Sequence, residues 1–270
     1  MTRTLQDAFY TADLVQVPVS ELECFYDTIL EGDSDSLLEL FAGEPYLNTP
    51  LQGEIKGSAP LRQFVSRQQA WLKEREAHSE LINAIISDQR MVIEFTLYIT
   101  HEGRTIDLPV ALAADRDGEG LSEIRVYHST WPLSGEHIVR APIVQPPAEK
   151  LEEPAVVKAY MAGIQKPDKE LVLSLFVEDG YVREPSGARF RHQGPEGLRQ
   201  FYDPALDAGG VVLHHCTATF DGHTFAVEYI CDEWANVKLP PQAGLAVYEL
   251  AGPYKLQAAR IYDDVLPPFE

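Results

Sequence analysis

Three ionisable side chains in the second half of the chain could do acid–base chemistry: Tyr160, Glu184 and Asp264. A carboxylate in apolar surroundings has its charged form disfavoured, so its pKa rises and it can take up a proton or activate a water. A buried phenol nearby can donate a hydrogen bond to an oxygen on which negative charge develops. The matching positions of the first half carry no ionisable group: Phe25, Thr49 and Ser129. The three side chains are therefore candidates for a site that only the second half has.

The two halves can be compared because the chain contains an internal repeat. Residues 38–50 align without a gap on residues 173–185, and Leu-Arg-Gln-Phe recurs at 61–64 and 198–201. Further blocks follow in the same order: 92–95 with 226–229, and 125–127 with 260–262. The repeating unit of roughly 115 residues has the size of one domain. We interpret positions kept in both halves as part of the fold, and a polar group present in one half as a candidate for function.

Each repeat begins with helical periodicity and ends with strand-like segments. Apolar residues at steps of three and four predict a first helix around residues 22–29 and 156–164. Asp33 and Asp168 precede a second apolar run, where an N-cap is expected, and a third helix starts near Ser58 or Pro195. Segments rich in branched and aromatic residues predict the strands: 91–100, 109–114, 121–127, 224–231, 244–250 and 255–262. This order predicts α+β units whose helices cover one face of a curved antiparallel sheet.

We expect four segments along the chain. Residues 1–20 form an N-terminal arm, 21–133 the first unit, 134–153 a linker and 154–270 the second unit. The linker is predicted to be extended and partly polyproline-like, because it is rich in proline.

Composition excludes several classes of function. The chain has 270 residues, of which 45% are hydrophobic, so two domains with ordinary cores fit. A net charge of -20 argues against binding to nucleic acids or anionic membranes, and we interpret the acidity as favouring solubility. The N-terminus has no long apolar run, so neither a signal peptide nor a membrane span is expected.

Cysteine and histidine spacing indicates no metal site. The three cysteines are widely separated, which argues against a zinc site or a disulfide framework and favours a cytoplasmic location. No His-x-His or His-x-x-x-His pair occurs, so we expect neither a metal nor another cofactor.

The ordered set of blocks resembles the nuclear transport factor 2 superfamily, in particular ketosteroid isomerases and SnoaL-like polyketide cyclases. Residues 158–164 resemble the first isomerase helix, 175–185 a family segment that ends in acid-proline, and 194–201 the third helix. In the first half, residues 95–96 and 103–104 fit one strand pair of the family. The resemblance rests on the order of the blocks, because no single motif among them is a signature.

The resemblance implies two tandem cone-shaped units, each a curved antiparallel sheet wrapped by about three helices around an apolar pocket. Because family members dimerise through the outer sheet face, we expect the units to pack as an intramolecular pseudo-dimer. Strand alternation places Glu94 and Glu228 on that face, so we interpret them as interface or solvent residues. Arg125 and Arg260, kept in both halves, are expected to pair with acids. The sequence leaves open whether the pseudo-dimer forms homo-oligomers.

The resemblance also implies roles for the candidate residues. Glu184 matches the base carboxylate before proline, Tyr160 the oxyanion donor of the first helix, and Asp264 an acid that SnoaL-like cyclases carry near the last strand's end. Tyr160 could equally be a core tyrosine, and the two acids solvated strand-end residues. Residues 243–246, where the isomerases carry a second acid, are apolar, which argues against steroid isomerisation by the same oxyanion hole.

Three further residues are candidates for ligand binding. Tyr262 belongs to the last repeated block. His214 and His215 are neighbours in a predicted strand, so one of them faces the core and could carry a proton. A structural histidine is the favoured alternative.

The leading hypothesis is a cofactor-independent acid–base enzyme: an isomerase, cyclase, dehydratase or hydrolase of a small apolar carbonyl compound, lactone or epoxide. The first unit would then be a supporting domain with a dry or shrunken pocket. The alternatives are a non-catalytic module that binds an apolar small molecule, and a structural or assembly protein with filled pockets. An enzyme would need Glu184 inside the cone, within hydrogen-bond reach of Tyr160 or Asp264.

Overall fold

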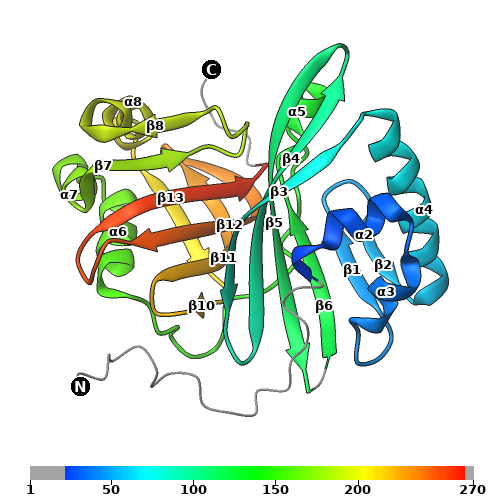
Figure 1. The fold of residues 1–270 in the computed structure, drawn as a ribbon. Helices are drawn as coiled ribbons and strands as arrows, with labels where there is room; N and C mark the ends of the chain where they lie inside the picture. Colours follow the sequence, from blue (N-terminus) through cyan, green and yellow to red (C-terminus); the bar gives the residue numbers. More distant parts are fainter. Residues whose placement is uncertain (1–21, 119, 265–270) are drawn as a thin grey trace, which may run out of the picture.

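The computed structural model describes residues 22–118 and 120–264; the expected arm, residues 1–20, lies outside the described residues. Within them the chain forms two α+β units, with a six-stranded sheet in the first and a seven-stranded sheet in the second. The sheets lie side by side in the middle of the molecule, and the main helices of the two units lie at opposite ends (Figure 1). This arrangement confirms the expected fold class.

Within the described residues, the first unit has three helices and six strands before the connecting segment. The helices are α2 (Phe25–Glu31), α3 (Ser34–Glu39) and α4 (Ser58–Glu74). The strands are β1 (Tyr46–Thr49), β2 (Gly53–Lys56), β3 (His78–Ile86), β4 (Arg90–His101), β5 (Arg104–Asp117) and β6 (Gly120–Tyr127). Their order is β2-β1-β6-β5-β4-β3, and only β1 and β6 run parallel. The sequence did not predict β3, because this edge strand is largely exposed and lacks a clear apolar alternation.

The second unit repeats this plan. Its helices are α6 (Ala155–Gln165), α7 (Lys169–Ser174) and α8 (Gly194–Asp207). Its strands are β7 (Phe176–Arg183), β8 (Arg191–Gln193), β9 (Val211–His215), β10 (Thr219–Phe220), β11 (Thr224–Trp234), β12 (Val237–Leu250) and β13 (Leu256–Asp263). The order is β10-β11-β12-β13-β7-β8, with β9 beside β11. Between the units, the short helix α5 (Trp131–Ser134) is followed by residues 135–154, which contain neither helix nor strand.

The second helix of each unit is capped as predicted. The Oδ1 of Asp33 accepts a hydrogen bond of 3.1 Å from the backbone N–H of Ser36. The Oδ1 of Asp168 accepts one of 3.0 Å from the N–H of Leu171. Each carboxylate satisfies a backbone donor that the helix leaves without a partner and also lies at the positive end of the helix dipole.

Each sheet contributes one face to its own unit's core and the other face to an interface between the units. Alternation along β4 points Ile93 toward the helices of the first unit and Val92 toward the second unit. The interface core consists mainly of small and branched residues: Ile85, Val92, Ala111, Ala113, Tyr127, Ala226, Ala243, Leu245, Val247 and Tyr262. Small side chains let the two sheets approach closely, and the expected sheet-to-sheet pseudo-dimer is confirmed.

Two buried ion pairs cross this interface in opposite directions. The carboxylate of Glu94 accepts hydrogen bonds from Nε and Nη2 of Arg260, each 2.7 Å long. The carboxylate of Glu228 accepts bonds of 2.6 and 2.8 Å from Nε and Nη2 of Arg125. All four residues are at most 4% exposed. Each unit therefore supplies the acid for the other unit's arginine, which identifies the acids as interface residues and the arginines as their partners.

A tyrosine completes each pair. The hydroxyl of Tyr262 donates to Glu94 at 2.6 Å, and that of Tyr127 donates to Glu228 at 2.7 Å. Burial pushes the pKa of both glutamates upward, but the arginine and tyrosine contacts outweigh burial and leave each pKa below its usual value. Tyr262, a candidate ligand-binding residue, thus has its hydroxyl at the interface.

Replacing Arg125 with methionine should destabilise the protein by about 3 to 5 kcal/mol, because Glu228 would remain buried without its main partner. Denaturant unfolding measures this loss. Adding Glu228→Met should restore much of the stability. As a control, Arg62→Met breaks an exposed pair with Asp35, whose side chains are 49% and 71% exposed, and should change stability little. An equal effect of Arg125→Met and Arg62→Met would contradict a role for the buried pair.

The same pair should make stability depend on pH. A carboxyl whose pKa is lower in the folded than in the unfolded chain stabilises the fold above the unfolded value, about 4.3 for glutamate. This contribution is lost as the pH falls through the folded value. The stability difference between wild type and Arg125→Met should therefore be largest above about pH 5 and shrink in stronger acid. A difference that stays constant down to the onset of acid unfolding would contradict this assignment.

Candidate functional site

The second unit encloses a cavity of about 340 Å³ between α6, α8 and the sheet. Its wall is largely apolar and includes the side chains of Ile164, Phe201, Leu206, Val211, Leu213 and Ile261. Six of the polar side chains that line it form three bonded pairs. A largely apolar wall with a few polar groups is the usual form of a small-molecule site.

The first pair joins Glu184, which directly follows β7, to His192 on β8. The Nε2 atom of His192 contacts Oε1 of Glu184 at hydrogen-bonding distance. The side chain of Glu184 is 29% exposed and that of His192 is 19% exposed. The backbone N–H of Glu184 donates to the carbonyl of Phe190 at 3.0 Å, which closes the loop between the two strands. Glu184 therefore lies at the rim of the cavity, partly buried, and its bonded partner is His192, not Tyr160 or Asp264.

The first unit supports this rim. Asp107 on β5 accepts a hydrogen bond of 2.9 Å from the backbone N–H of Arg189 through its side chain. Its backbone carbonyl accepts another of 3.1 Å from the N–H of Ala188. The loop that follows Glu184 is thus held by a strand of the other unit.

The second pair joins Tyr229 to Asp263 across the intervening strand. Gly244 on β12 is paired with Tyr229 on one side and with Asp263 on the other. The hydroxyl of Tyr229 donates to Oδ2 of Asp263 at 2.5 Å. A Cβ atom at Gly244 would lie 2.4 Å from the Tyr229 ring, so only glycine lets the ring cross the strand. Burial, and then the charge of Asp263, raise the pKa of Tyr229 well above its usual value.

The third pair consists of two buried phenols. The hydroxyls of Tyr160 and Tyr202 lie 2.9 Å apart, and each residue is 4% exposed. Burial raises the pKa of Tyr160 to about 12, so both phenols are neutral near pH 7. In such a pair one hydroxyl donates to the other, and the second keeps a proton that it can offer to a molecule in the cavity.

Asp264 lies away from this cavity. Its Oδ1 accepts a bond of 2.5 Å from the hydroxyl of Ser129, and its Oδ2 accepts one of 2.7 Å from the backbone N–H of Ile138. The hydroxyl of Thr130 also donates to this carboxylate. The structure therefore does not bring Asp264 together with Tyr160 and Glu184. Asp264 instead binds the second unit to residues that follow β6, the last strand of the first unit. Asp263, one position earlier, faces the cavity instead.

The two histidine candidates also lie outside the cavity wall. The side chain of His214 is 49% exposed and lies 3.2 Å from a carboxylate oxygen of Asp232. The side chain of His215 is 8% exposed, and its Nδ1 lies 2.6 Å from Oε1 of Glu153. Each histidine is therefore paired with an acid that does not line the cavity.

Sequence reasoning missed several residues of the site. The sequence analysis expected Arg260 to pair with an acid. Because side chains alternate between the two faces of a strand, Asp263 lies on the face opposite Arg260 and Asp264 on the same face, so alternation would have selected Asp263. His192 was not among the candidates, because no sequence signal pairs it with Glu184. His137, which also lines the cavity, comes from the segment after α5, and its Nδ1 lies 3.1 Å from Oδ1 of Asp264.

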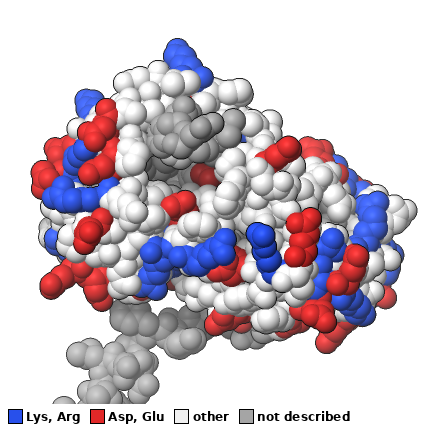
Figure 2. Space-filling view, turned by 90° about the horizontal axis from the view of Figure 1, so that it is seen from above, with Lys and Arg blue, Asp and Glu red and all other residues white. Residues whose placement is uncertain are grey.

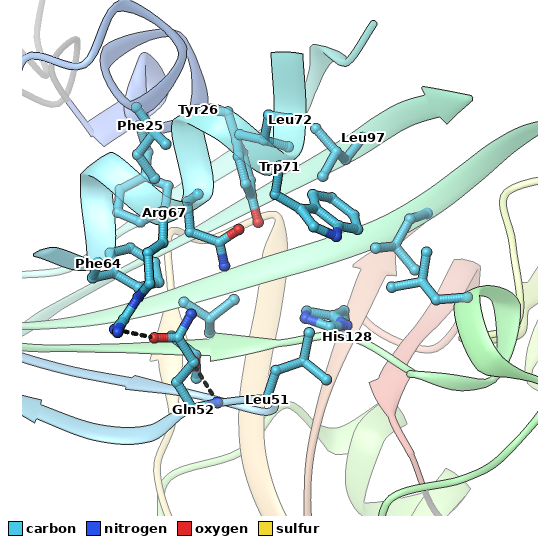
Figure 3. A pocket seen from close by; sticks show the side chains of 16 residues that line it. Phe25, Tyr26, Leu51, Gln52, Phe64, Arg67, Trp71, Leu72, Leu97 and His128 are labelled. Carbon is cyan, nitrogen blue, oxygen red and sulfur yellow. Dashed lines mark hydrogen bonds between the residues drawn. The ribbon is translucent and has the colours of Figure 1, made fainter. Parts of the chain in front are cut away.

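A matching cavity of about 210 Å³ occurs in the first unit (Figure 3). Phe25, Thr49 and His128 line it at the positions where the second unit has Tyr160, Glu184 and Asp263. Among the described residues, no carboxylate lines this first cavity. The pocket of the first unit is smaller than that of the second, but it is not filled.

Other kinds of site find little support in the part of the chain that the structure describes. It contains no grouping of three histidine, cysteine or acidic side chains that could hold a metal ion. It also contains no helix that is long and apolar enough to cross a membrane. On the face that Figure 2 shows, basic side chains lie among acidic ones instead of forming one basic patch.

Gly244→Ala should push the Tyr229 ring away from Asp263 and destabilise the protein by about 1 to 3 kcal/mol, because the added methyl overlaps the ring. Denaturant unfolding measures this change. In a Tyr229→Val background the same alanine should cost little, since the ring is gone. Gly43→Ala is the control, because a Cβ there meets no atom within 4 Å. A Gly244→Ala variant as stable as wild type would contradict the crossing arrangement.

Comparison with known proteins supplies the context for this geometry. No family model matches the chain, and no curated protein matches it. A nuclear transport factor 2-like protein of unknown function from Cytophaga hutchinsonii is 17% identical, with a TM-score of 0.34, over 40% of this chain and 96% of its own. A putative polyketide cyclase from Sinorhizobium meliloti is 11% identical, with a TM-score of 0.32, over 40% and 93%.

A hypothetical protein with a ketosteroid isomerase-like fold from Catenulispora acidiphila, in complex with trimethylamine, is 16% identical. Its TM-score is 0.34, and the match covers 40% of this chain and 85% of its own. At such identities the likeness concerns the fold alone, and each match has the length of about one unit. The chain is a tandem of two α+β units, and a stretch about one unit long is similar in fold to nuclear transport factor 2-like proteins.

Proposed function

We propose that the second unit is a cofactor-independent acid–base enzyme that acts on a small, largely apolar carbonyl compound, lactone or epoxide. One observation carries the proposal: a single apolar cavity is lined by two carboxylates and by a phenol pair with a proton to donate. Each carboxylate is bonded to a neighbouring side chain that can hold it in place. Burial of ionisable groups beside one another in a cavity is typical of acid–base sites.

Glu184 is the base in this proposal. Its carboxylate takes a proton from the carbon next to a carbonyl, or from a water that attacks a lactone or epoxide. His192 donates from Nε2 to this carboxylate and so orients it. The partial exposure of Glu184 supports a step at the rim, where the proton can exchange with solvent.

The Tyr160–Tyr202 pair is the oxyanion donor. Because both phenols are neutral, the free O–H can bond an enolate or alkoxide oxygen as negative charge develops on it. The phenols already hold each other in place before substrate binds, which is what makes such donors effective.

Asp263 replaces Asp264 as the second acid of the proposal. Its bond from Tyr229 fixes the carboxylate on the cavity wall, where it can orient a water or a substrate hydroxyl. The contacts of Asp264 with Ser129 and Ile138 support a structural role for that residue instead.

A non-catalytic binding module remains the second candidate, and one observation favours it. Glu184 is 29% exposed at the rim, and its bonded partner is His192 and not the phenol pair, an arrangement that a binding module tolerates. A purely structural protein with filled pockets is disfavoured, because both cavities are open.

Turnover in D₂O tests the proposal. Cyclic ketones, lactones and terpene epoxides are incubated with the protein, and NMR follows deuterium uptake next to the carbonyl or the formation of ring-opened product. Glu184→Gln should lower the rate by about 100-fold or more, the usual contribution of a general base. Glu178→Gln, an exposed residue on the same strand β7, is the matched control and should keep the wild-type rate.

Thermal unfolding with the same compounds separates the two candidates. A bound ligand at 100 times its dissociation constant adds about 2.7 kcal/mol of stability. Equal stabilisation of wild type and Glu184→Gln by a compound that is not turned over would contradict the enzyme proposal and support the binding module.

A further inference from the structure

The cavity of the first unit is lined by one permanent cation. Arg67 on α4 donates from Nη2 to Oε1 of Gln52 at 3.0 Å, and the backbone N–H of Gln52 donates to Oγ1 of Thr49 at 3.1 Å (Figure 3). These bonds hold the guanidinium beside the turn between β1 and β2 and use only one of its several N–H donors. No ion pair joins Arg67 to an acidic residue within residues 22–118 and 120–264.

Arg67 is exposed to solvent and is bonded to Gln52, not to a carboxylate. The protein has 42 acidic and 22 basic residues, so a carboxylate is the commonest charged neighbour that an arginine could find. The equivalent cavity of the second unit is lined instead by Glu184 and Asp263. The two cavities thus differ in charge, and the first favours a ligand that carries a negative group.

The interior of this first cavity also contains polar atoms that a ligand can use. Tyr26 is 8% exposed, its side chain points into the cavity (Figure 3), and its hydroxyl has no hydrogen-bond partner among the described residues. Because the hydroxyl faces the cavity, it can donate a hydrogen bond to a bound molecule. The Nδ1 of His128 lies 3.0 Å from the carbonyl oxygen of Ser129. Since a carbonyl only accepts, Nδ1 carries the hydrogen and Nε2 is left as an acceptor.

Size and wall define the rest of the ligand. About 210 Å³ lies below the roughly 300 Å³ at which sites for drug-sized molecules begin, so the cavity has room for about one ring. Phe25, Phe64 and Trp71 supply aromatic surface around it (Figure 3). Aromatic rings pack well against such walls.

We infer that the cavity of the first unit is a second ligand site, which binds a monocyclic aromatic carboxylate with its carboxylate on Arg67 and its ring among Phe25, Phe64 and Trp71. A polar substituent at the far end of the ring would meet the hydroxyl of Tyr26 and Nε2 of His128. A planar carboxylate suits the fork of a guanidinium, which can donate two parallel hydrogen bonds to it. This site is independent of the chemistry proposed for the second unit.

The three tryptophans allow a test that reports on each cavity separately. Trp71 lines the first cavity and Trp234 the second, whereas Trp131 lies in α5 and is 37% exposed. The full chain is labelled with ¹⁵N-tryptophan, the indole N–H signals are assigned with Trp→Phe variants, and 4-hydroxyphenylacetate is titrated as the probe. The Trp71 signal should shift saturably, and the Trp234 signal should stay in place.

Two comparisons establish the role of charge. Arg67→Gln should weaken binding at least about tenfold, the loss expected when a hydrogen bond between charged groups is removed. Arg62→Gln, on the same helix but outside the cavity wall, should bind as wild type does. The neutral 4-hydroxyphenylacetamide, titrated into the wild type, should bind correspondingly more weakly, and this comparison needs no variant to fold.

Three results would overturn the inference: a Trp71 signal that does not move up to about 10 mM probe, equal binding of acid and amide, or a shift confined to Trp234. The last result would place the ligand in the second cavity. Glu184→Gln should leave the Trp71 titration unchanged, so a failure of this site and a failure of the proposed enzyme can be told apart.

Discussion

The reciprocal ion pairs between the units are the interaction on which the rest of the structure depends. A carboxylate buried in a sheet interface is tolerated only when a cation and further donors meet it, and here that cation always comes from the other unit. Neither sheet face could be exposed alone without leaving an acid or an arginine unpaired. The glutamate, arginine and tyrosine of the interface are the same in both halves of the repeat, whereas the cavity residues behind them differ.

The interface also decides which side chains enter the second cavity. Along β13, Arg260 and Tyr262 point to Glu94 in the first unit. Alternation then turns Ile261 and Asp263 toward the cavity. A shift of one residue would exchange these two sets, so the buried ion pair fixes the register that makes Asp263 a cavity acid. The interface therefore helps to determine which side chains line the site.

The sequence predicted most of the fold because the repeat doubles each local signal. The capping aspartates Asp33 and Asp168 are confirmed, and so is the sheet-to-sheet packing. The sequence could not say that Glu94 pairs with the arginine of the other unit, since both halves carry an identical acid and an identical base. Nor could it find His137 or His192, because their places near the second cavity follow from how loops fold back in space. The confusion of Asp264 with its neighbour arose from assigning the acid at the end of the last strand by family resemblance instead of by strand alternation.

The polar residues on the sheet side of the second cavity depend on one another. Tyr229 can reach Asp263 only because Gly244 leaves room on the strand between them. In the first unit Phe95 is paired with Val110 at the corresponding place, so neither the hydroxyl nor the gap exists there. A change at one of these positions alone would give a clash or a buried polar group without a partner. The two cavities therefore differ by concerted sets of residues: the sheet supplies the acid of the second, and the helices supply Arg67 and Tyr26 to the first.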